Sequence, residues 1–254
     1  MAGLVLLARD GPSTRMLFHA LAGELDIRDV IVEDPVPYGD FLARRARRYG
    51  WPTVIGQLAF RAGVVPYLKR RSRTRRREIL EQHGLDDAPL DPTRVTPVPS
   101  VNSAAAIQRL QALQPTVVLV SGTRIVAREV LASIPAPFVN VHAGVTPLYR
   151  GVHGAYWALV QGDREHCGVT VHLLDEKIDT GPILGQATIA PTDRDDFTTY
   201  PWLQLAAGLP VLRRALRDLM EGRRTIVDPP AGTSRYWTHP TIVEYVRHRR
   251  RGVR

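Results

Sequence analysis

The sequence predicts an α/β fold in which a mostly parallel sheet is flanked by helices. Short apolar or β-branched runs recur along the chain, helix-like amphipathic segments separate them, and polar or glycine-containing turns follow them. Strands that alternate with helices in this way are typical of βαβ units, whose strands lie parallel in one sheet. The chain has 254 residues, 44% of them hydrophobic, and is therefore long enough to bury a substantial core.

The expected strands are runs rich in Val, Ile and Leu that are bounded by turn residues. In chain order, we expect them at residues 4–8, 29–33, 95–98, 116–120, 138–141, 169–174, 183–189 and 223–227. The third run contains Pro97, which cannot donate a ladder hydrogen bond, so we expect this strand at an edge of the sheet.

The expected helices are segments in which apolar residues return at helical spacing. In chain order, we expect them at residues 14–25, 38–83, 103–113, 127–133, 154–160, 197–220 and 241–251. The segment 38–83 lies between two strands and is interpreted as a helical insertion. Gly50-Trp51-Pro52 should break it, and Gly63 and Pro66 should break it again. Pro210 should bend the helix over residues 197–220.

Positive charge is concentrated in this insertion. Residues 44–77 hold twelve Arg or Lys and no Asp or Glu, so against a net charge of +9 the remaining chain carries −3. A basic segment of this kind can meet nucleic acid, a phosphorylated substrate or an acidic protein. It can equally be a solvated helix face in a chain that uses Arg in preference to Lys.

The composition also limits the location and the cofactors. No apolar run approaches the length of a membrane span, and the N-terminus reads as a first strand without a basic leader. The single cysteine, Cys167, excludes an intrachain disulfide and a cysteine-based metal cluster. We therefore expect a cytoplasmic protein without membrane contact. We expect residues 1–230 to form one catalytic domain and residues 231–254 to form an extension with a terminal helix.

Three polar side chains follow two of the expected strands. Asn140 and His142 are two residues apart, which puts both on one face of an extended chain, and Asp179 lies in the turn after residues 169–174. An amide and an imidazole on one face can donate hydrogen bonds to a developing oxyanion, and a nearby Asp can move a proton. The loop 121–126 follows another strand end, where ligands of open α/β sheets bind.

Other interpretations of these residues remain open. They can be a triad, structural or turn residues, or part of a metal site that includes His153 and His172, although no compact metal-ligand motif is present. We expect no metal.

The same stretches resemble the folate-dependent formyltransferase family. The resemblance rests on Asn140-Val141-His142, Pro147–Gly151, Gly168–His172, Asp179-Thr180-Gly181 and the upstream loop Ser121–Ile125. It covers residues 115–190 well, fades toward the N-terminus and is absent from residues 38–83. It implies a Rossmann-like formyltransferase fold.

The resemblance also implies a reaction. The donor would be 10-formyltetrahydrofolate, and an acceptor amine would attack its formyl carbon. Asn140 and His142 would stabilise the oxyanion, while Asp179 would orient His142 and relay the proton. The pterin ring would lie against the backbone of two loops, through Arg124, Ile125, Val126, Glu176, Lys177 and Ile178, and His172 would support the site.

Departures from the family pattern bear on the acceptor. Gly144-Val145-Thr146-Pro147 replaces the usual Ser-Leu-Leu-Pro turn, which approaches the acceptor. The turn at residues 10–13 is poor in glycine, which argues against glycinamide ribonucleotide as the acceptor. The family also includes methionyl-tRNA formyltransferase, which has a second domain, and formyltetrahydrofolate deformylase, which has an N-terminal regulatory domain. We expect neither of these additional domains here. We therefore expect a small amine: an amino sugar, an amino acid derivative or a biosynthetic intermediate, phosphorylated or carrier-linked.

Two further hypotheses compete with formyl transfer to a small amine. One is hydrolysis of 10-formyltetrahydrofolate by the same residues. The other is a catalytically retired protein that binds nucleic acid or a partner through Arg44–Arg77, although we do not expect nucleic acid as the partner. The helix over residues 197–220 is also a candidate surface for a homodimer.

Overall fold

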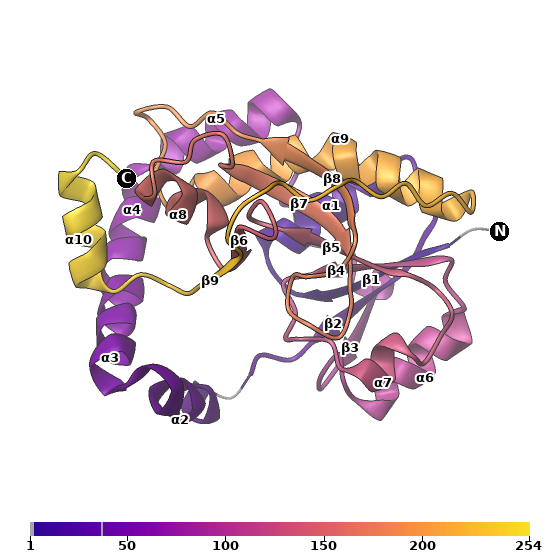
Figure 1. Ribbon diagram of the computed structural model, residues 1–254. Coiled ribbons are helices and arrows are strands. Elements are labelled where there is room, and N and C mark those ends of the chain that lie inside the picture. The colour runs from indigo at the N-terminus through magenta and orange to yellow at the C-terminus, as the bar shows by residue number, and fades with distance from the viewer. Residues whose placement is uncertain (1–2, 37) are drawn as a thin grey trace.

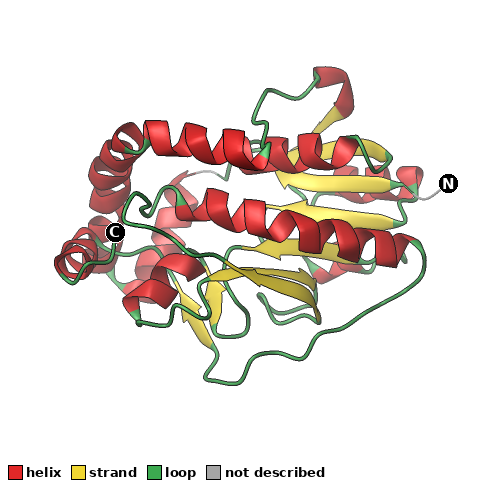
Figure 2. Ribbon diagram, turned by 90° about the horizontal axis from the view of Figure 1, so that it is seen from above, coloured by secondary structure: helices red, strands yellow, loops and turns green. Residues whose placement is uncertain are grey.

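The computed structural model describes residues 3–36 and 38–254 and is built around one large sheet flanked by helices (Figures 1 and 2). The sheet has seven strands in the order β3-β2-β1-β4-β5-β7-β8. Their bounds are β1 Leu4–Arg9, β2 Ile27–Glu33, β3 Val95–Val98, β4 Val117–Ser121, β5 Phe138–His142, β7 Gly168–Leu173 and β8 Ile183–Thr188. The first five strands in the order pair in parallel, and β7 and β8 add two antiparallel pairings. The predicted fold class is therefore confirmed.

Both faces of the sheet are buried, as its continuous apolar strands require. Leu4 and Leu6 of β1 face one core layer with α1 and α9, whereas Val5 and Leu7 face a second layer with α6 and α7. The edge position predicted from Pro97 is confirmed, because β3 pairs with β2 alone. Residues 223–227 do not form the expected strand, and Val227 makes only an isolated bridge to Ile183.

The helices lie close to their predicted positions. Their bounds are α1 Pro12–Ala22, α6 Ala104–Leu113, α7 Arg128–Leu131, α8 Gly154–Val160, α9 Tyr200–Met220 and α10 Ile242–Arg250. Helix α9 continues through Pro210 as one helix, and its leucines Leu205, Leu209, Leu212 and Leu216 are buried against the sheet. The apolar stripe of α9 therefore packs against the sheet of its own chain.

The segment between β2 and β3 forms four α-helices joined by few other residues. They are α2 Tyr38–Tyr49, α3 Trp51–Ala59, α4 Val65–Arg71 and α5 Arg73–His83. The predicted break at Gly50 is confirmed. The predicted break at Gly63 and Pro66 is wrong, because residues Phe60–Val64 form a π-helical turn and the helix continues. The amide of Val65 bonds to the Phe60 carbonyl five residues earlier, so the wider turn takes up the disturbance.

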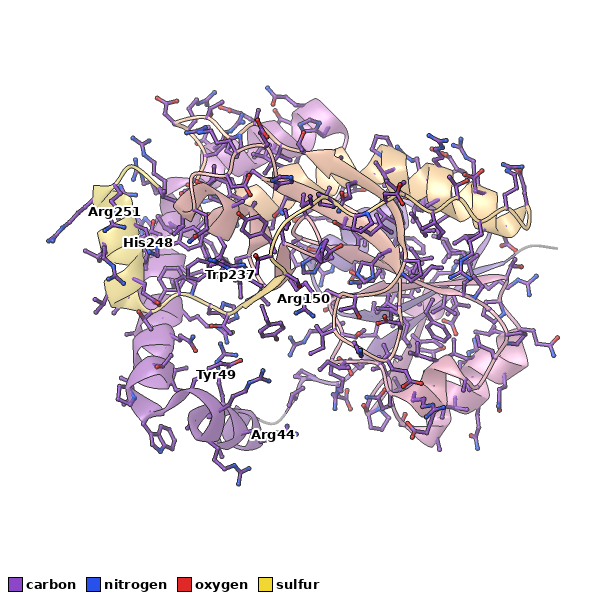
Figure 3. All side chains as sticks on the ribbon, viewed as in Figure 1. Arg44, Tyr49, Arg150, Trp237, His248 and Arg251 are labelled. Atoms are coloured by element: carbon purple, nitrogen blue, oxygen red, sulfur yellow. The ribbon has the colours of Figure 1, made fainter. Side chains whose placement is uncertain are left out.

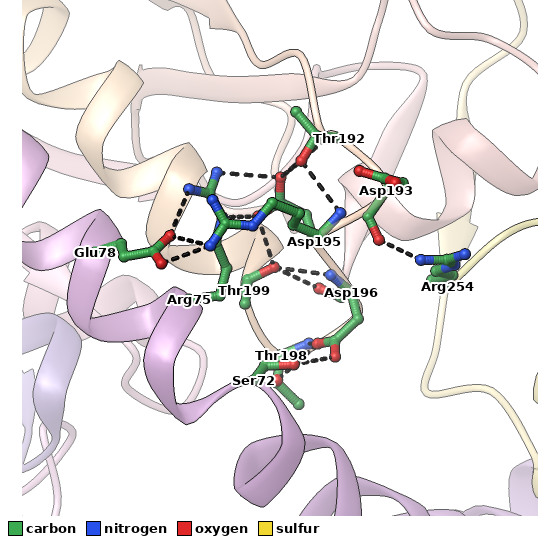
Figure 4. A network of polar contacts seen from close by, with 11 residues as sticks. Ser72, Arg75, Glu78, Thr192, Asp193, Asp195, Asp196, Thr198, Thr199 and Arg254 are labelled. Atoms are coloured by element: carbon green, nitrogen blue, oxygen red, sulfur yellow. Dashed lines mark hydrogen bonds and ion pairs between the residues drawn. The ribbon is translucent and has the colours of Figure 1, made fainter.

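A buried polar network fastens α5 to the loop before α9 (Figure 4). Nε of Arg75 lies 2.8 Å from Oδ1 of Asp195, and the Ser72 hydroxyl donates to the buried Asp196 carboxylate. Glu78 pairs with Arg194 in the same network. Part of the basic segment therefore has a structural role, because its charge is matched by acids distant in sequence.

The C-terminal segment reaches back to the centre of the molecule (Figure 1). Strand β9 (Arg235–Trp237) pairs in parallel with β6 (Tyr149–Gly151), and neither run is among the strands expected from the sequence. The ring of Trp237 stacks on that of Trp157 with centroids 4.6 Å apart. A strand of three residues is too short to show a period, and its pairing depends on this distant aromatic contact.

The helices of the described chain include none with the length and apolarity that crossing a bilayer demands.

Candidate active site

A cavity of about 410 Å³ opens at the carboxyl ends of β4 and β5. This is where ligands bind in open α/β sheets. The cavity wall includes eight of the nine predicted site residues: Asn140, His142, Asp179, Arg124, Ile125, Val126, Lys177 and Ile178. Two sequence regions, 120–143 and 174–179, thus meet around one space.

Asn140 and His142 lie on one face of β5 because side chains alternate along a strand. In the neighbouring β7, Asn140 is opposite His172 and His142 is opposite Thr170. The Thr170 hydroxyl donates to the Gly144 carbonyl and accepts from the Thr146 amide. The cross-strand partners therefore hold the turn that follows His142.

Both ring nitrogens of His142 face oxygen atoms. Nε2 donates to the Tyr149 carbonyl at 2.8 Å, and Nδ1 lies 3.4 Å from Oδ1 of Asp179. A carbonyl only accepts hydrogen bonds, so Nε2 carries hydrogen and is fully engaged. The nitrogen that can serve a ligand in the cavity is Nδ1, and Asp179 is its partner.

The Asp179 carboxylate is held by the chain beside it. Its Oδ2 accepts from the Gly151 amide at 2.9 Å, and Asp179 adopts a positive φ of 54°, which Asp tolerates better than most residues. Gly151 must be glycine, because a Cβ there would lie 2.2 Å from the Trp237 carbonyl oxygen. The β6–β9 pair therefore sets the position of the carboxylate.

The buried His172 orients the amide of Asn140. Its Nδ1 donates to the Leu173 carbonyl at 2.9 Å, and burial lowers the pKa of His172, so the neutral ring leaves Nε2 as an acceptor. Nδ2 of Asn140 lies 3.1 Å from that Nε2 and donates to it. One N–H of the amide is thereby fixed.

The loop after β4 is clamped to the end of β2. The buried Glu33 carboxylate accepts from the Arg124 amide at 2.7 Å and from the Arg124 side chain. Asn102 bridges the same loop, since it donates to the Ile125 carbonyl at 2.9 Å and accepts from Ala127. Among the predicted loop residues, Ile125 lines the cavity and exposes 65% of its surface. Its apolar side chain is therefore available to contact a ligand.

Glu176 is the one predicted site residue that does not line the cavity. It is exposed and forms an ion pair with Arg128 at 3.0 Å. Its neighbours Lys177 and Ile178 face the cavity, and the Ile178 carbonyl accepts from Arg150.

Several residues that shape the site were not predicted from the sequence. Glu33 and Asn102 clamp the loop 122–127, and Tyr236 lines the cavity from the C-terminal segment. An acid at the end of a strand and the β-prone triplet Arg235–Trp237 were the available signals, and both are weak. Across residues 3–36 and 38–254, no cluster of His, Cys, Asp and Glu is suited to hold a metal ion.

Comparisons with known proteins agree with this architecture. The sequence model of the formyl transferase family matches residues 64–201, just over half of the chain. The chain belongs to this family. The match includes α4 and α5, so it begins inside the segment interpreted as an insertion, whereas α2 and α3 lie outside it.

Curated relatives cover part of this chain. A methionyl-tRNA formyltransferase of Caldanaerobacter subterraneus subsp. tengcongensis is 34% identical over 123 residues, which are 48% of this chain and 40% of that protein. A methionyl-tRNA formyltransferase of a Roseiflexus species is 43% identical over 91 residues, 35% of this chain and 28% of that protein. The matches thus span less than half the length of these relatives.

Solved structures share the fold at low identity. A sugar N-formyltransferase from a Shewanella species superposes with a TM-score of 0.57 at 14% identity and covers 93% of this chain and 76% of that chain. A glycinamide ribonucleotide transformylase from Symbiobacterium toebii superposes with a TM-score of 0.57 at 22% identity, and the match covers 90% of this chain and 92% of that chain.

Proposed function

We propose that this protein transfers a formyl group from 10-formyltetrahydrofolate to a primary amine of a small acceptor, with Asn140, His142 and Asp179 as the catalytic residues. The observation that carries the proposal is the 3.4 Å approach of His142 Nδ1 to Asp179 Oδ1 in a cavity that Asn140 also lines. Family membership supports the reaction class.

The donor would lie between the two loops that line the cavity. The exposed side chain of Ile125 and the buried Val126 would cover the pterin ring, and backbone groups of residues 124–126 and 176–179 would hydrogen-bond to it. Bound 10-formyltetrahydrofolate supplies an activated formyl group and a nitrogen leaving group. The residues fit such a ligand because an apolar wall and backbone polar groups are what a flat heterocycle needs.

Asn140 and His142 would serve the formyl oxygen. Asn140 would act through the amide N–H that does not bond to His172, and His142 through Nδ1, as negative charge develops on that oxygen. Asp179 would orient the His142 ring and relay the proton lost by the attacking amine toward the departing folate nitrogen.

The test combines the purified protein with 10-formyltetrahydrofolate and a panel of amines. The panel contains amino sugars, their phosphates, amino acids and methionyl-tRNA, because the curated relatives include methionyl-tRNA formyltransferases. Formylated product should appear with one member of the panel, and the Asn140→Ala variant should form it about 10²–10³-fold more slowly. Absence of both folate binding and any formylated product would refute the proposal.

Hydrolysis of the donor is the second candidate, since the same three residues can activate water in place of an amine. Formate release without an acceptor, at the rate of the best transfer reaction, would favour the hydrolase.

A further inference from the structure

Helix α2 is held beside the cavity because it is connected to the C-terminal segment, which lines part of that cavity. The buried Gln57 accepts from the Arg45 side chain at 2.8 Å and donates to the His239 carbonyl at 2.7 Å. Gln57 thus ties α2 to the chain that continues from β9. In Figure 3, Tyr49 of α2 lies below Trp237 and Arg150 of the β6–β9 pair.

Arg48 of α2 reaches a wall of the cavity. Its guanidinium carbon lies 5.7 Å from the ring centroid of Tyr236 and 5.4 Å from that of Tyr49. Tyr236 lines the cavity and exposes 42% of its surface. An arginine held over aromatic rings keeps its N–H edges available, because the attraction acts through the face of the guanidinium.

The charges around Tyr236 connect this arginine with the candidate catalytic residues. Burial raises the pKa of the Tyr236 hydroxyl, nearby Tyr49 and Asp179 raise it further, and Arg48 and Arg45 lower it. Tyr236 therefore lies within electrostatic reach of both the Asp179 carboxylate and the arginines of α2. A molecule that places its amine near Asp179 and extends along Tyr236 arrives at Arg48.

The positive charge of Arg48 is not matched locally. Residues 41–77 contain no Asp or Glu, and among the described residues no carboxylate forms an ion pair with Arg48 or with its exposed neighbour Arg47. The other end of the basic segment differs, because Arg75 is paired with the buried Asp195. Unlike the charge of Arg75, the charge of Arg48 beside the cavity is therefore available to a ligand.

We propose that Arg48, held between Tyr49 and Tyr236, forms an anion subsite at the mouth of the cavity, and that the acceptor amine carries a phosphate or carboxylate group bound there. The inference rests on the proposed function for the identity of the ligand as the acceptor. Arginine binds either group through two parallel N–H···O bonds.

The binding test uses the whole protein without folate. Inorganic phosphate and acetate are titrated separately at constant ionic strength, and binding is followed by calorimetry and by tryptophan fluorescence, to which Trp237 contributes. We expect Arg48→Gln to weaken binding of the preferred anion about 10-fold, as loss of a charge-assisted hydrogen bond does. Arg47→Gln is the matched control, since it makes the same charge change one residue away, and should change binding less than about 2-fold.

The preference between the two anions identifies the acceptor group. Tighter phosphate binding indicates a phosphorylated acceptor, and tighter acetate binding indicates a carboxylate. In turnover, Arg48→Gln should then raise KM for the matching amine about 10-fold and leave kcat and the folate Kd unchanged. An amine of equal size without the anionic group should not respond to the substitution.

Two results would overturn the inference: equal weakening by Arg48→Gln and Arg47→Gln, or no saturable binding of either anion to the parent protein. Anion binding requires neither folate nor turnover, so its outcome is separate from that of the proposed function. Formyl transfer without an Arg48-dependent subsite would refute this inference alone, and Arg48-dependent anion binding without formyl transfer would refute the proposed function alone.

Discussion

Nδ1 of His142 lies 3.4 Å from Oδ1 of Asp179. This approach is not expected from the strands alone, because β7, which precedes Asp179, ends beside the first residues of β5, whereas His142 is the last residue of β5. Strand β7 runs antiparallel to β5, so Leu173 is opposite Val139, and the amide of Leu174 bonds to the Phe138 carbonyl. Residues 174–182 must therefore fold back along the sheet to reach His142. The Gly151 amide and the Arg150 side chain fasten the returning loop at Asp179 and Ile178.

Replacing Asp179 with Asn should remove the proton relay and preserve the loop. Asn tolerates the positive φ and has the same shape, so the change is mainly one of charge. We expect kcat to fall about 10²–10⁴-fold, as for loss of a general base, with folate Kd within about 3-fold. Steady-state kinetics and folate titration check this, and an unchanged thermal midpoint excludes unfolding as the cause. Activity close to that of the parent would contradict the relay.

Asn140 and His172 should act as one unit. Asn140→Ala is expected to lower kcat about 10²–10³-fold, because an oxyanion donor is lost. His172→Gln should lower it less, because the amide loses its orientation and not its donor group. The double variant should be no worse than Asn140→Ala, since residues in direct contact are not additive. A double variant in which the two losses multiply would show that His172 acts independently of Asn140.

The exposed side chain of Ile125 should contribute to donor binding. Ile125→Asp removes an apolar contact worth about 1.5–3 kcal/mol, so the folate Kd should rise about 10-fold or more. Ile55→Asp is a matched control, because Ile55 of α3 is 60% exposed, compared with 65% for Ile125, and lies outside the cavity. Equal effects of the two substitutions in a folate titration would remove Ile125 from the donor site.

The Arg75–Asp195 ion pair should support the fold strongly. Arg75→Ala leaves the buried Asp195 carboxylate without its guanidinium, which typically costs about 3–5 kcal/mol. The exposed pair Arg15–Asp10 offers the control, and Arg15→Ala should cost less than about 1 kcal/mol. Urea unfolding measures both free energies. A similar cost for the two variants would mean that α5 does not depend on this network.

His239 should make the protein less stable in mild acid. Burial lowers the pKa of His239 to about 4, and its ring bonds to His153 at 3.0 Å. The unfolded chain binds the proton first, at its ordinary pKa of about 6.5, so the free energy of unfolding should fall as the pH drops from about 6.5 to about 4. The expected slope is up to about 1.4 kcal/mol per pH unit for this group.

His239→Gln isolates this contribution, because an amide can still bond to His153 and does not titrate. Urea unfolding at several pH values should give a shallower slope for the variant between pH 6.5 and 4. An identical slope would assign the acid sensitivity to other groups.

Much of this protein could be predicted from its sequence because the relevant signals are local. Continuous apolar runs such as Leu4–Ala8 require a strand covered on both faces, and Pro97 excludes a central position for its strand. The spacing of Asn140 and His142 puts both side chains on one face whatever the partner strand is. The meeting of the loop 121–126 with Asn140 and His142 followed from where parallel strands end, because β4 and β5 are parallel neighbours.

Features that depend on contacts between residues distant in sequence could not be predicted from local patterns. Gly63 and Pro66 are residues that typically break a helix, but here a π-helical turn over Phe60–Val64 keeps backbone hydrogen bonds in place and the helix continues. Strand β9 forms because Trp237 stacks on Trp157 and because β6 offers an edge for pairing. Both Trp157 and β6 are distant from β9 in the sequence. The apolar stripe of the helix over residues 197–220 was evident from its spacing, but only the fold shows that the sheet covers Leu205, Leu209, Leu212 and Leu216.

The sequence by itself therefore determined the class of fold and the family, and it named the candidate residues that the structure brings together at one cavity, because periodicity, residue type and motif spacing are properties of the chain. The tertiary structure decided how Asp179 reaches His142, which of its neighbours hold it there, and that α2 brings Arg48 to the rim of the cavity. These positions depend on contacts between residues that are distant along the chain, by 28 residues for Gly151 with Asp179 and by 182 for Gln57 with His239, and contacts of that range leave no local pattern in the sequence.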